Sequence, residues 1–360
     1  MDDTAYMARA LALAKKGLGR TSPNPMVGCV VVRGGAIVGE GFHERAGGPH
    51  AEVSAIEVAG RERIAGSTLY ITLEPCTHTG KTPPCVDLLL ELRPARVVVA
   101  MQDPNPLVSG GGIARLREVG IAVETGVLEA EAQRLNETFT TYITTGRPFV
   151  TAKWAMTADG KIATRTGHSQ WVTGEAARER VHEMRDAVDA ILVGSRTVMM
   201  DNPRLTTRLA GRQGKDPVRI VLDGADYLSC DHAIFNQASA APTWVAVSKP
   251  DREYDCADEV LYVPQGPDGV DMAALMGELG GRSITSLLIE GGGTTLAAAF
   301  SAGIVHKVCF FIAPSIIGGR DALTPVEGTG VETMDAARRL RDLEVETVGP
   351  DLMVTGYVEH

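Results

Sequence analysis

The feature that most constrains how this chain can fold is a set of four side chains that must meet at one point. His50 is followed two residues later by Glu52, and two cysteines come later, Cys76 directly after Pro75 and Cys85 after a gap of eight residues. Imidazole and thiolate groups are the donors that zinc prefers in proteins. We therefore expect a fold that brings these distant segments together around a metal ion.

The same four residues predict a chemistry. Three protein ligands, His50, Cys76 and Cys85, leave one position of a tetrahedral zinc ion open for water. Zinc lowers the pKa of such a water from about 15.7 toward about 7, which makes hydroxide available at neutral pH. Glu52 is then the expected catalytic residue, which moves a proton from water to a departing amine. A His-x-Glu pair followed by Pro-Cys and a second Cys is typical of zinc-dependent deaminases.

Two other interpretations of these residues stay open. The cysteines can be buried thiols without a metal, because free cysteine is often a core residue. The zinc site can also be structural and closed by a fourth ligand, for which His78 and His43 are the candidates. The gap between Cys76 and Cys85 is longer than the two residues usual in deaminases.

Alternating apolar segments indicate an α/β fold in two domains. Residues 68–73 predict a buried strand and residues 50–58 a helix, which puts the ligands at a strand end and a helix start. The Gly146-Arg147-Pro148 break separates the expected domains, 1–146 and 147–360. Further helices are expected near 2–17, 84–92, 113–119 and 173–187, and strands at 27–32, 36–41, 95–100, 149–155, 190–193, 218–222, 243–247, 261–263, 283–289 and 307–312.

Charge and composition narrow the partners. A formal net charge of −10 argues against a nucleic-acid partner, which needs clustered Lys and Arg. No apolar run reaches membrane-spanning length and the first residues do not resemble a signal peptide, so we expect no membrane association and a cytoplasmic protein. Six cysteines in such a chain predict metal ligands and buried thiols rather than disulfides. The remaining four are expected to be packing residues: Cys29, Cys230, Cys256 and Cys309.

The second half has three segments that suit a nucleotide. Gly291-Gly292-Gly293 lies between an expected strand and helix, and is either a phosphate cradle or simply a tight turn. The segments 194–197 and 169–173 carry hydroxyls beside helix starts, the second with Trp171, which by composition alone is more often a core residue. Arg185 and Arg208 are candidates for a substrate phosphate, with a solvated helix face or loop as the alternative.

Several short motifs span nearly the whole chain: Tyr6-Met7-Ala8-Arg9-Ala10, Pro23-Asn24-Pro25, Val27-Gly28-Cys29-Val30, His50-Ala51-Glu52, Leu73-Glu74-Pro75-Cys76, Lys81-Thr82-Pro83-Pro84-Cys85, Met101-Gln102-Asp103-Pro104-Asn105-Pro106, Ser169-Gln170-Trp171, Asp201-Asn202-Pro203 and Glu290-Gly291-Gly292. Together these motifs closely resemble the bifunctional deaminase–reductase family of riboflavin biosynthesis. The long cysteine gap, unusual for a generic deaminase, is a feature of that family.

The resemblance implies a cytidine-deaminase-like α/β/α domain followed by a dihydrofolate-reductase-like α/β domain. The first would use Zn²⁺ to deaminate 2,5-diamino-6-ribosylamino-4(3H)-pyrimidinone 5′-phosphate, and the second would use NADPH to reduce the ribosyl side chain to ribityl. By the same resemblance, the substrate-binding residues are Asn24, His43 and Lys81 in the first domain and Ser169, Arg185, Leu205, Arg208 and Glu290 in the second. The cofactor-binding residues are Ala155, Trp171, Thr197, Asp201, Gly291, Gly292 and Gly293, with Lys153 and Asp159 as further candidates.

Two rival functions remain at this point. One is a nucleoside or tRNA deaminase with an unrelated appendage, and the other is a zinc-stabilised nucleotide-binding protein without catalysis. The glycine-rich α/β second half argues against the first rival, because a plain deaminase has no use for it.

Reductase domains of this type often pair through a sheet edge, so we expect a homo-oligomer, with a dimer favoured.

Overall fold

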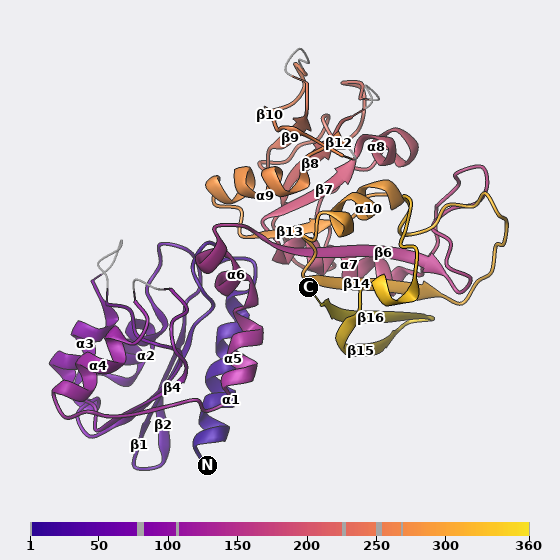
Figure 1. The fold of residues 1–360 in the computed structure, drawn as a ribbon. Helices are drawn as coiled ribbons and strands as arrows, with labels where there is room; N and C mark the ends of the chain where they lie inside the picture. The colour runs from indigo at the N-terminus through magenta and orange to yellow at the C-terminus, as the bar shows by residue number, and fades with distance from the viewer. Residues whose placement is uncertain are drawn as a thin grey trace. The chain divides into compact units, whose positions relative to one another are not determined.

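Two compact units make up the chain. The computed structural model describes residues 2–77, 83–105, 108–224, 228–249, 254–267 and 269–359. Its contacts divide the chain into Met1–Gly146 and Arg147–His360, each built around its own sheet (Figure 1). Among the described residues, no helix combines the length and apolar character that crossing a bilayer requires. The elements expected from the sequence are all present, with ends that differ by three residues or fewer, as at Ser286 for the strand expected from 283.

The first unit has a five-stranded sheet in the order β2-β1-β3-β4-β5. Strand β1 pairs antiparallel with β2 and β3, whereas β3, β4 and β5 run parallel. The central strands are almost continuously apolar because both faces of the sheet are covered. The strands are β1 (Gly28–Arg33), β2 (Ala36–Phe42), β3 (Thr68–Leu73), β4 (Arg96–Met101) and β5 (Ala122–Thr125).

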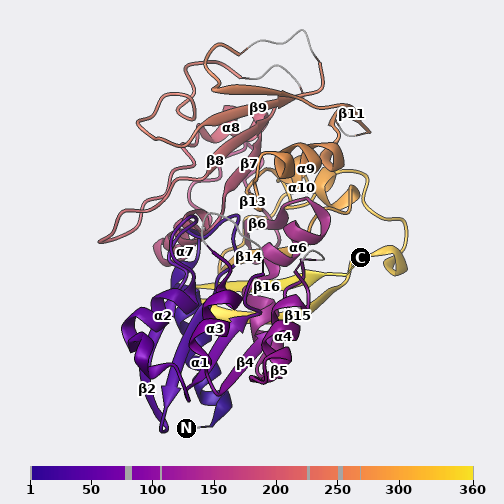
Figure 2. The ribbon, with the colours of Figure 1, turned by 90° about the vertical axis from the view of Figure 1, so that its left-hand side faces the viewer.

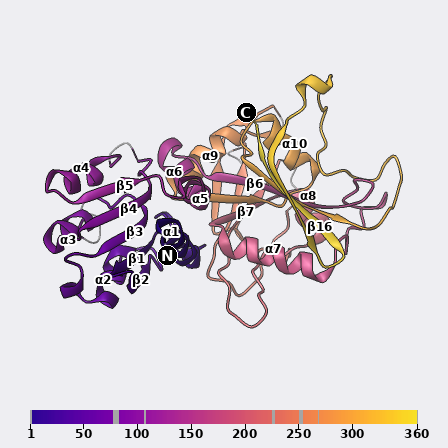
Figure 3. The same cartoon turned by 90° about the horizontal axis from the view of Figure 1, so that it is seen from below.

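Helices cover both faces of this sheet and give three layers (Figure 3). Residues of α2, α3 and α4 form one core with Cys29, Val31 and Ile71, and residues of α1 and α5 form another with Val30 and Tyr70. Successive strand residues thus point to opposite cores, as the pleat requires. The helices are α1 (Asp3–Ala14), α2 (Ala51–Ala59), α3 (Cys85–Leu92), α4 (Gly111–Glu118), α5 (Glu129–Leu135) and α6 (Glu137–Thr145), with short 3₁₀ turns at Lys15–Gly17 and Arg61–Arg63.

Two glycines of β2 set the position of α2. A Cβ on Gly39 would lie 2.3 Å from the Ala55 carbonyl oxygen, and a Cβ on Gly41 would lie 2.4 Å from the Ala55 nitrogen. Only glycine allows the helix backbone to approach a strand this closely. The helix that follows His50 is therefore held against the sheet by backbone contact.

The second unit has a nine-stranded sheet in the order β10-β9-β8-β7-β13-β6-β14-β16-β15 (Figure 2). Its first seven strands run parallel, and β16 and β15 add an antiparallel edge. The strands are β6 (Phe149–Thr157), β7 (Ala190–Gly194), β8 (Val218–Leu222), β9 (Thr243–Val247), β10 (Glu259–Tyr262), β13 (Ser286–Ile289), β14 (Lys307–Ala313), β15 (Leu340–Val348) and β16 (Asp351–Val358), with a small hairpin of β11 (Gln265–Gly266) and β12 (Gly269–Val270).

Helices again pack on both faces. One core joins α9 and α10 to the sheet, and two smaller cores join α7 and α8 to the opposite face. In parallel sheets, ligands bind outside the carboxyl ends of the strands. The helices are α7 (Glu175–Ala187), α8 (Ser195–Asp201), α9 (Met272–Gly281) and α10 (Gly293–Ser301), with a 3₁₀ turn at Met334–Ala336.

Two cysteine predictions are corrected by the structure. Cys230 and Cys256 form a disulfide, with Cα atoms 5.5 Å apart. No motif marks this pair, because the residues are 26 positions apart and meet only through the fold. Cys29 and Cys309 are buried thiols, as expected.

Candidate active sites

The structure brings the three predicted zinc ligands together. His50 directly precedes α2, Cys76 follows β3, and Cys85 begins α3. The His50 Nδ1 atom lies 3.1 Å from Cys85 Sγ and 3.6 Å from Cys76 Sγ, and the three donor atoms all lie within 4.8 Å of one another. One imidazole and two thiols at this spacing fit a zinc ion with an open coordination position.

The surroundings of the two sulfurs favour a thiolate. The Cys85 backbone N–H donates to Cys76 Sγ over 3.3 Å. The pKa of Cys76 is lowered to about 4, first by the Cys85 thiol, which donates to it, and then by His50. The pKa of Cys85 is raised correspondingly, because its proton is shared with Cys76 and its site is buried. One sulfur is thus ready to bind a cation at neutral pH.

Glu52 lies on the first turn of α2 with only 3% of its surface exposed. Burial raises the pKa of its carboxyl to about 7, and the negative charge of Cys76 adds to that rise. A carboxyl with a pKa near neutrality exchanges protons efficiently at neutral pH.

A cavity of about 260 Å³ opens beside these residues. The predicted substrate residues Asn24 and His43 both line it, together with His50, Glu52 and Cys76. The His43 ring is held from both sides, with Nε2 3.1 Å from Asn24 Nδ2 and Nδ1 2.9 Å from the Pro49 carbonyl oxygen. Both nitrogens are therefore engaged, which removes His43 as a fourth ligand, whereas Lys81 and His78 lie outside the described residues.

One wall of this cavity has no signal in the sequence. Phe139, Tyr142 and Ile143 of α6 line it, although no motif marks that helix. Asn136 precedes α6 and fixes it to the Pro23–Val27 segment. Its Oδ1 accepts from the Met26 N–H over 2.8 Å, and its Nδ2 donates to the Met26 carbonyl over 3.0 Å.

Glu74 holds the segment that carries Cys76. This carboxylate is 3% exposed and sits two residues before the ligand. It accepts four backbone N–H groups at 2.9–3.2 Å, and a Cβ on Gly112 would lie 2.3 Å from the Pro75 carbonyl oxygen. The metal-ligand segment is therefore fastened to the start of α4. The four donors are Asp103, Gly110, Gly112 and Ile113.

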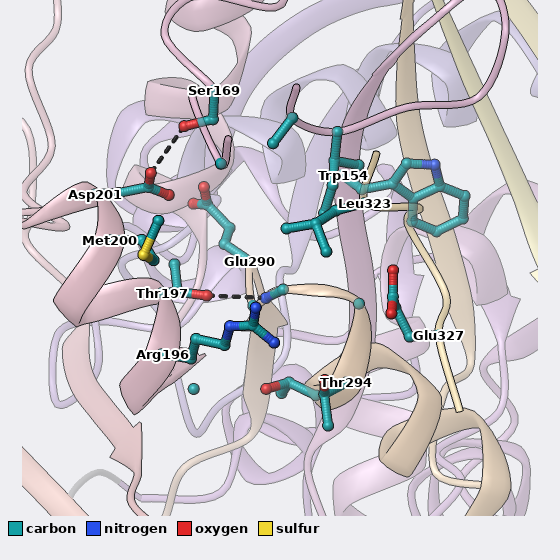
Figure 4. A pocket seen from close by; sticks show the side chains of 18 of the residues that line it. Trp154, Ser169, Arg196, Thr197, Met200, Asp201, Glu290, Thr294, Leu323 and Glu327 are labelled. Atoms are coloured by element: carbon teal, nitrogen blue, oxygen red, sulfur yellow. Dashed lines mark hydrogen bonds between the residues drawn. The ribbon is translucent and has the colours of Figure 1, made fainter. Parts of the chain in front are cut away.

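The second unit has a cavity of about 380 Å³ at the carboxyl ends of β6, β7 and β13 (Figure 4). This is where a parallel sheet is expected to bind a nucleotide. The predicted residues that line it are Lys153, Ala155, Ser169, Thr197, Asp201, Glu290, Gly291, Gly292 and Gly293. The other predicted residues of this unit are not part of the lining: Asp159, Trp171, Arg185, Leu205 and Arg208.

A largely buried ion-pair network lies at one end of this cavity. The Arg185 guanidinium donates two hydrogen bonds of 2.7 and 3.0 Å to the Glu290 carboxylate, and the Lys153 amine lies 3.5 Å from the same carboxylate. Burial alone would raise the pKa of Glu290, but the charges of Arg185 and Lys153 outweigh it and lower that pKa to about 2. Arg185 is thus committed to a carboxylate rather than exposed on a helix face.

The turn Gly291–Gly293 is tightly packed, and the helix that follows it begins without a side-chain cap. A Cβ on Gly293 would lie 2.2 Å from Glu327 Cγ, and a Cβ on Gly291 would lie 2.8 Å from Thr295 Cβ. The Gly292 N–H donates to Thr197 Oγ1 over 3.0 Å, and no side chain caps the start of α10. Uncapped N–H groups beside a cavity fit the diphosphate of a dinucleotide. The tight turn is confirmed, and the phosphate cradle stays a prediction.

The other predicted residues have varied surroundings. Trp171 is 70% exposed, with the Arg178 guanidinium 4.9 Å from its ring centroid, so it is not a core residue. Leu205 is buried with a φ of 54°, and the Arg208 guanidinium donates to Thr206 Oγ1 over 2.8 Å. Partial burial and the charges of Arg185 and Arg204 lower the pKa of Arg208. Asp159 accepts from Thr157 Oγ1 and from the backbone of Ile317 and Gly318, which is a structural role.

Comparison with known proteins matches the two units to different family models. The family model described as the RibD C-terminal domain matches residues 148–354, and that of the cytidine and deoxycytidylate deaminase zinc-binding region matches residues 1–101. The riboflavin biosynthesis protein RibD of Actinobacillus pleuropneumoniae is 44% identical over 359 residues, which cover 98% of this chain and 95% of that protein. The protein of the same name from Escherichia coli K12 is 42% identical over 364 residues, with 98% of each chain covered.

Solved structures agree over the full length. Acinetobacter baumannii RibD, form 1, matches with a TM-score of 0.89 at 35% identity, covering 99% of both chains. A Thermotoga maritima protein, described as a diaminohydroxyphosphoribosylaminopyrimidine deaminase/5-amino-6-(5-phosphoribosylamino)uracil reductase, matches with a TM-score of 0.89 at 40% identity, again covering 99% of both chains.

Proposed function

Because this chain belongs to the RibD family of riboflavin biosynthesis proteins, we propose that residues 1–146 carry its deaminase activity and residues 147–360 its reductase activity. The expectations of a two-part α/β fold, of an enzyme with both activities, and of zinc and NADPH as cofactors are confirmed. The rival functions, a deaminase with an unrelated appendage and a binding protein without catalysis, are therefore set aside.

The proposed first reaction replaces the 2-amino group of 2,5-diamino-6-ribosylamino-4(3H)-pyrimidinone 5′-phosphate by oxygen and releases ammonia. His50, Cys76 and Cys85 would hold the zinc ion, which when bound supplies the Lewis acidity that makes water a nucleophile at neutral pH. Glu52 takes a proton from the attacking water and delivers it to the departing nitrogen. Its position, buried on the same turn that follows His50, supports this role.

The pyrimidine is proposed to lie in the cavity of about 260 Å³. Asn24, whose amide His43 holds in place, offers a hydrogen-bonding group to the ring, and the α6 side chains Phe139 and Tyr142 offer apolar contact. Lys81 remains the predicted contact for the substrate phosphate.

The proposed second reaction transfers hydride from NADPH to the ribosyl side chain and gives the ribityl product. The turn Gly291–Gly293 suits the cofactor diphosphate, with Ala155, Thr197 and Asp201 alongside. The substrate would lie toward Ser169 and Glu290, with its phosphate near Leu205 and the cationic pair Arg185 and Arg208. NADPH supplies the hydride, and these residues orient the two reactants. Trp171 stays a predicted cofactor contact.

One observation supports the proposal most strongly: three donor atoms from separate segments meet within 4.8 Å, beside a buried glutamate and a cavity. The test is zinc analysis of the purified protein, together with assays of ammonia release and NADPH oxidation on the pyrimidine phosphate. Zinc-loaded protein that folds but releases no ammonia would contradict the proposal.

Two further proposals concern assembly and compartment. We propose a homodimer that pairs through β15, the edge strand of the second sheet. We also propose the cytoplasm as the compartment. Its reducing conditions keep Cys76 and Cys85 as thiols available to zinc, and they would open the Cys230–Cys256 disulfide.

A further inference from the structure

The cavity of the second unit contains a cation whose role is not yet assigned. Arg196 lies on the first turn of α8, is exposed, and lines this cavity. Within the described part of the chain, its guanidinium has no hydrogen-bond or ion-pair partner. Lys153 lines the same cavity but is paired with Glu290. An unpartnered arginine directed at a cavity is a ready ligand for a phosphate.

The residues of the cavity are ordered along its length (Figure 4). The hydrogen-bonded pair Ser169–Asp201 and then Glu290 lie at one end. The bond between Thr197 and the glycine turn comes next, and the Arg196 guanidinium lies beyond it, toward Thr294. Arg196 is therefore at the end away from the Glu290 network.

A bound dinucleotide has to follow the same order. The nicotinamide must reach the substrate, which we place toward Glu290, and the diphosphate fits the uncapped start of α10. The adenosine end then extends toward Arg196. NADPH differs from NADH only by a phosphate on the 2′-oxygen of that adenosine. Asp321 and Glu327 also line the cavity and would repel this phosphate without a nearby cation.

We propose that Arg196 binds the adenosine 2′-phosphate and so makes the reductase prefer NADPH over NADH. The inference rests on the proposed reductase site. A planar guanidinium suits a phosphate because it donates two parallel hydrogen bonds. Arg196 thus decides which cofactor binds, while the glycine turn holds the part that both cofactors share.

The test is a fluorescence titration that measures the equilibrium binding of NADPH and of NADH in the absence of substrate. Arg196→Gln is expected to raise the NADPH Kd roughly tenfold to a hundredfold, as for a lost hydrogen bond to a charged group, and to change the NADH Kd by less than about twofold. An unchanged thermal unfolding midpoint shows that the variant is folded.

The matched control is Arg165→Gln, which removes an equal charge from another exposed arginine of the same cavity. It is expected to weaken both cofactors slightly and to a similar extent. If Arg196→Gln raises the Kd of NADPH and of NADH equally, Arg196 contacts the diphosphate and the proposal is overturned. The proposal is also overturned if Arg196→Gln changes neither Kd, or if only Arg165→Gln loses the preference for NADPH. Failure of the unaltered protein to bind either cofactor would instead contradict the proposed reductase site.

Discussion

At the scale of single residues, two buried glutamates show how surroundings set the charge of a carboxyl group. Burial and a neighbouring thiolate raise the pKa of Glu52 to about 7, whereas Arg185 and Lys153 overcome burial and lower the pKa of Glu290 to about 2. The first is suited to proton transfer and the second to a permanent charge. The two groups should therefore respond differently to replacement by glutamine.

Glu52→Gln is expected to abolish most of the ammonia release while zinc stays bound. The amide has nearly the same shape but neither accepts nor releases a proton near neutral pH, so the rate should fall by about 10²- to 10⁴-fold. The measurements are an ammonia assay and zinc content. Glu57→Gln changes an exposed residue of the same helix and should leave both unchanged. A Glu52→Gln rate near that of the unaltered protein would show that another group moves the proton.

Glu290→Gln is expected to destabilise the second unit at neutral pH, by about 3 kcal/mol, because Arg185 and Lys153 stay largely buried without their partner. The pKa of Glu290 is lowered on folding, so its contribution is complete above the unfolded pKa of about 4.3 and disappears as pH falls toward 2. The stability difference between the two proteins should shrink over that range.

Urea unfolding followed by tryptophan fluorescence measures this, because Trp154, Trp171 and Trp244 all lie in the second unit. Glu332→Gln removes an exposed carboxylate of the same unit and serves as the control. A difference that stays constant between pH 5 and pH 2 would contradict the assignment of charge to Glu290.

At the scale of elements, the close contact between β2 and α2 links the sheet to the zinc ligands. Gly41→Ala is expected to push α2 outward, because the new Cβ would lie 2.4 Å from the Ala55 nitrogen. Overpacking of this kind costs about 1–3 kcal/mol, and the displaced His50 should bind zinc more weakly. Zinc content and thermal unfolding measure the two effects.

Gly111→Ala is the matched control, since its Cβ would have only ordinary contacts, 3.6 Å or more from Thr77. Equal zinc content and stability in the two variants would show that α2 is not held by the strand.

The Cys230–Cys256 disulfide joins two loop segments of the second unit. The first segment also holds the chain after α8, because the Ala233 N–H donates to Asn202 Oδ1 over 2.7 Å. Cys230→Ser is expected to cost about 3 kcal/mol under oxidising conditions, from the loop that the bond no longer closes. Urea unfolding with and without a thiol reductant measures this, and the reductant should remove the difference. A difference that persists in reductant would assign the loss to packing instead.

The sequence predicted elements with a strong local pattern and missed those defined by tertiary contact. The apolar strand 68–73 and the zinc residues have a signal in their own neighbourhood, because metal ligands require particular residue types. Phe139 and Tyr142 lie on a polar helix without a motif, so their place in the cavity depends on how Asn136 fixes α6 to Met26. The disulfide was missed for the same reason.

The reductase residues show the same limit. The glycine turn was recognisable, whereas the choice of Glu290 as the partner of Arg185 and Lys153 was not. These residues come from three elements, α7, β6 and the end of β13, and only the sheet order places them together. An ion pair whose members are brought together by the order of strands in a sheet leaves no periodic pattern in the sequence.

At the scale of the whole molecule, the β15 edge supports the proposed dimer. Leu343 and Val345 are 57% and 65% exposed on this strand. An exposed edge strand that carries apolar side chains can pair with another chain. Val345→Lys is expected to shift the protein toward monomers, measured as mass by light scattering. A monomeric mass for the unaltered protein, or a dimer that tolerates this change, would contradict pairing through β15.

The hydrogen bonds of the Glu74 carboxylate affect how the metal centre loses and rebinds zinc. Its four backbone hydrogen bonds do not involve the cation, so removal of zinc by a chelator leaves the Cys76 segment tied to the start of α4. The emptied deaminase unit should remain a preorganised receptor that takes up zinc again without refolding. Loss of the ion would then interrupt catalysis reversibly, unlike in small zinc domains that exist as folded proteins only while their metal is present.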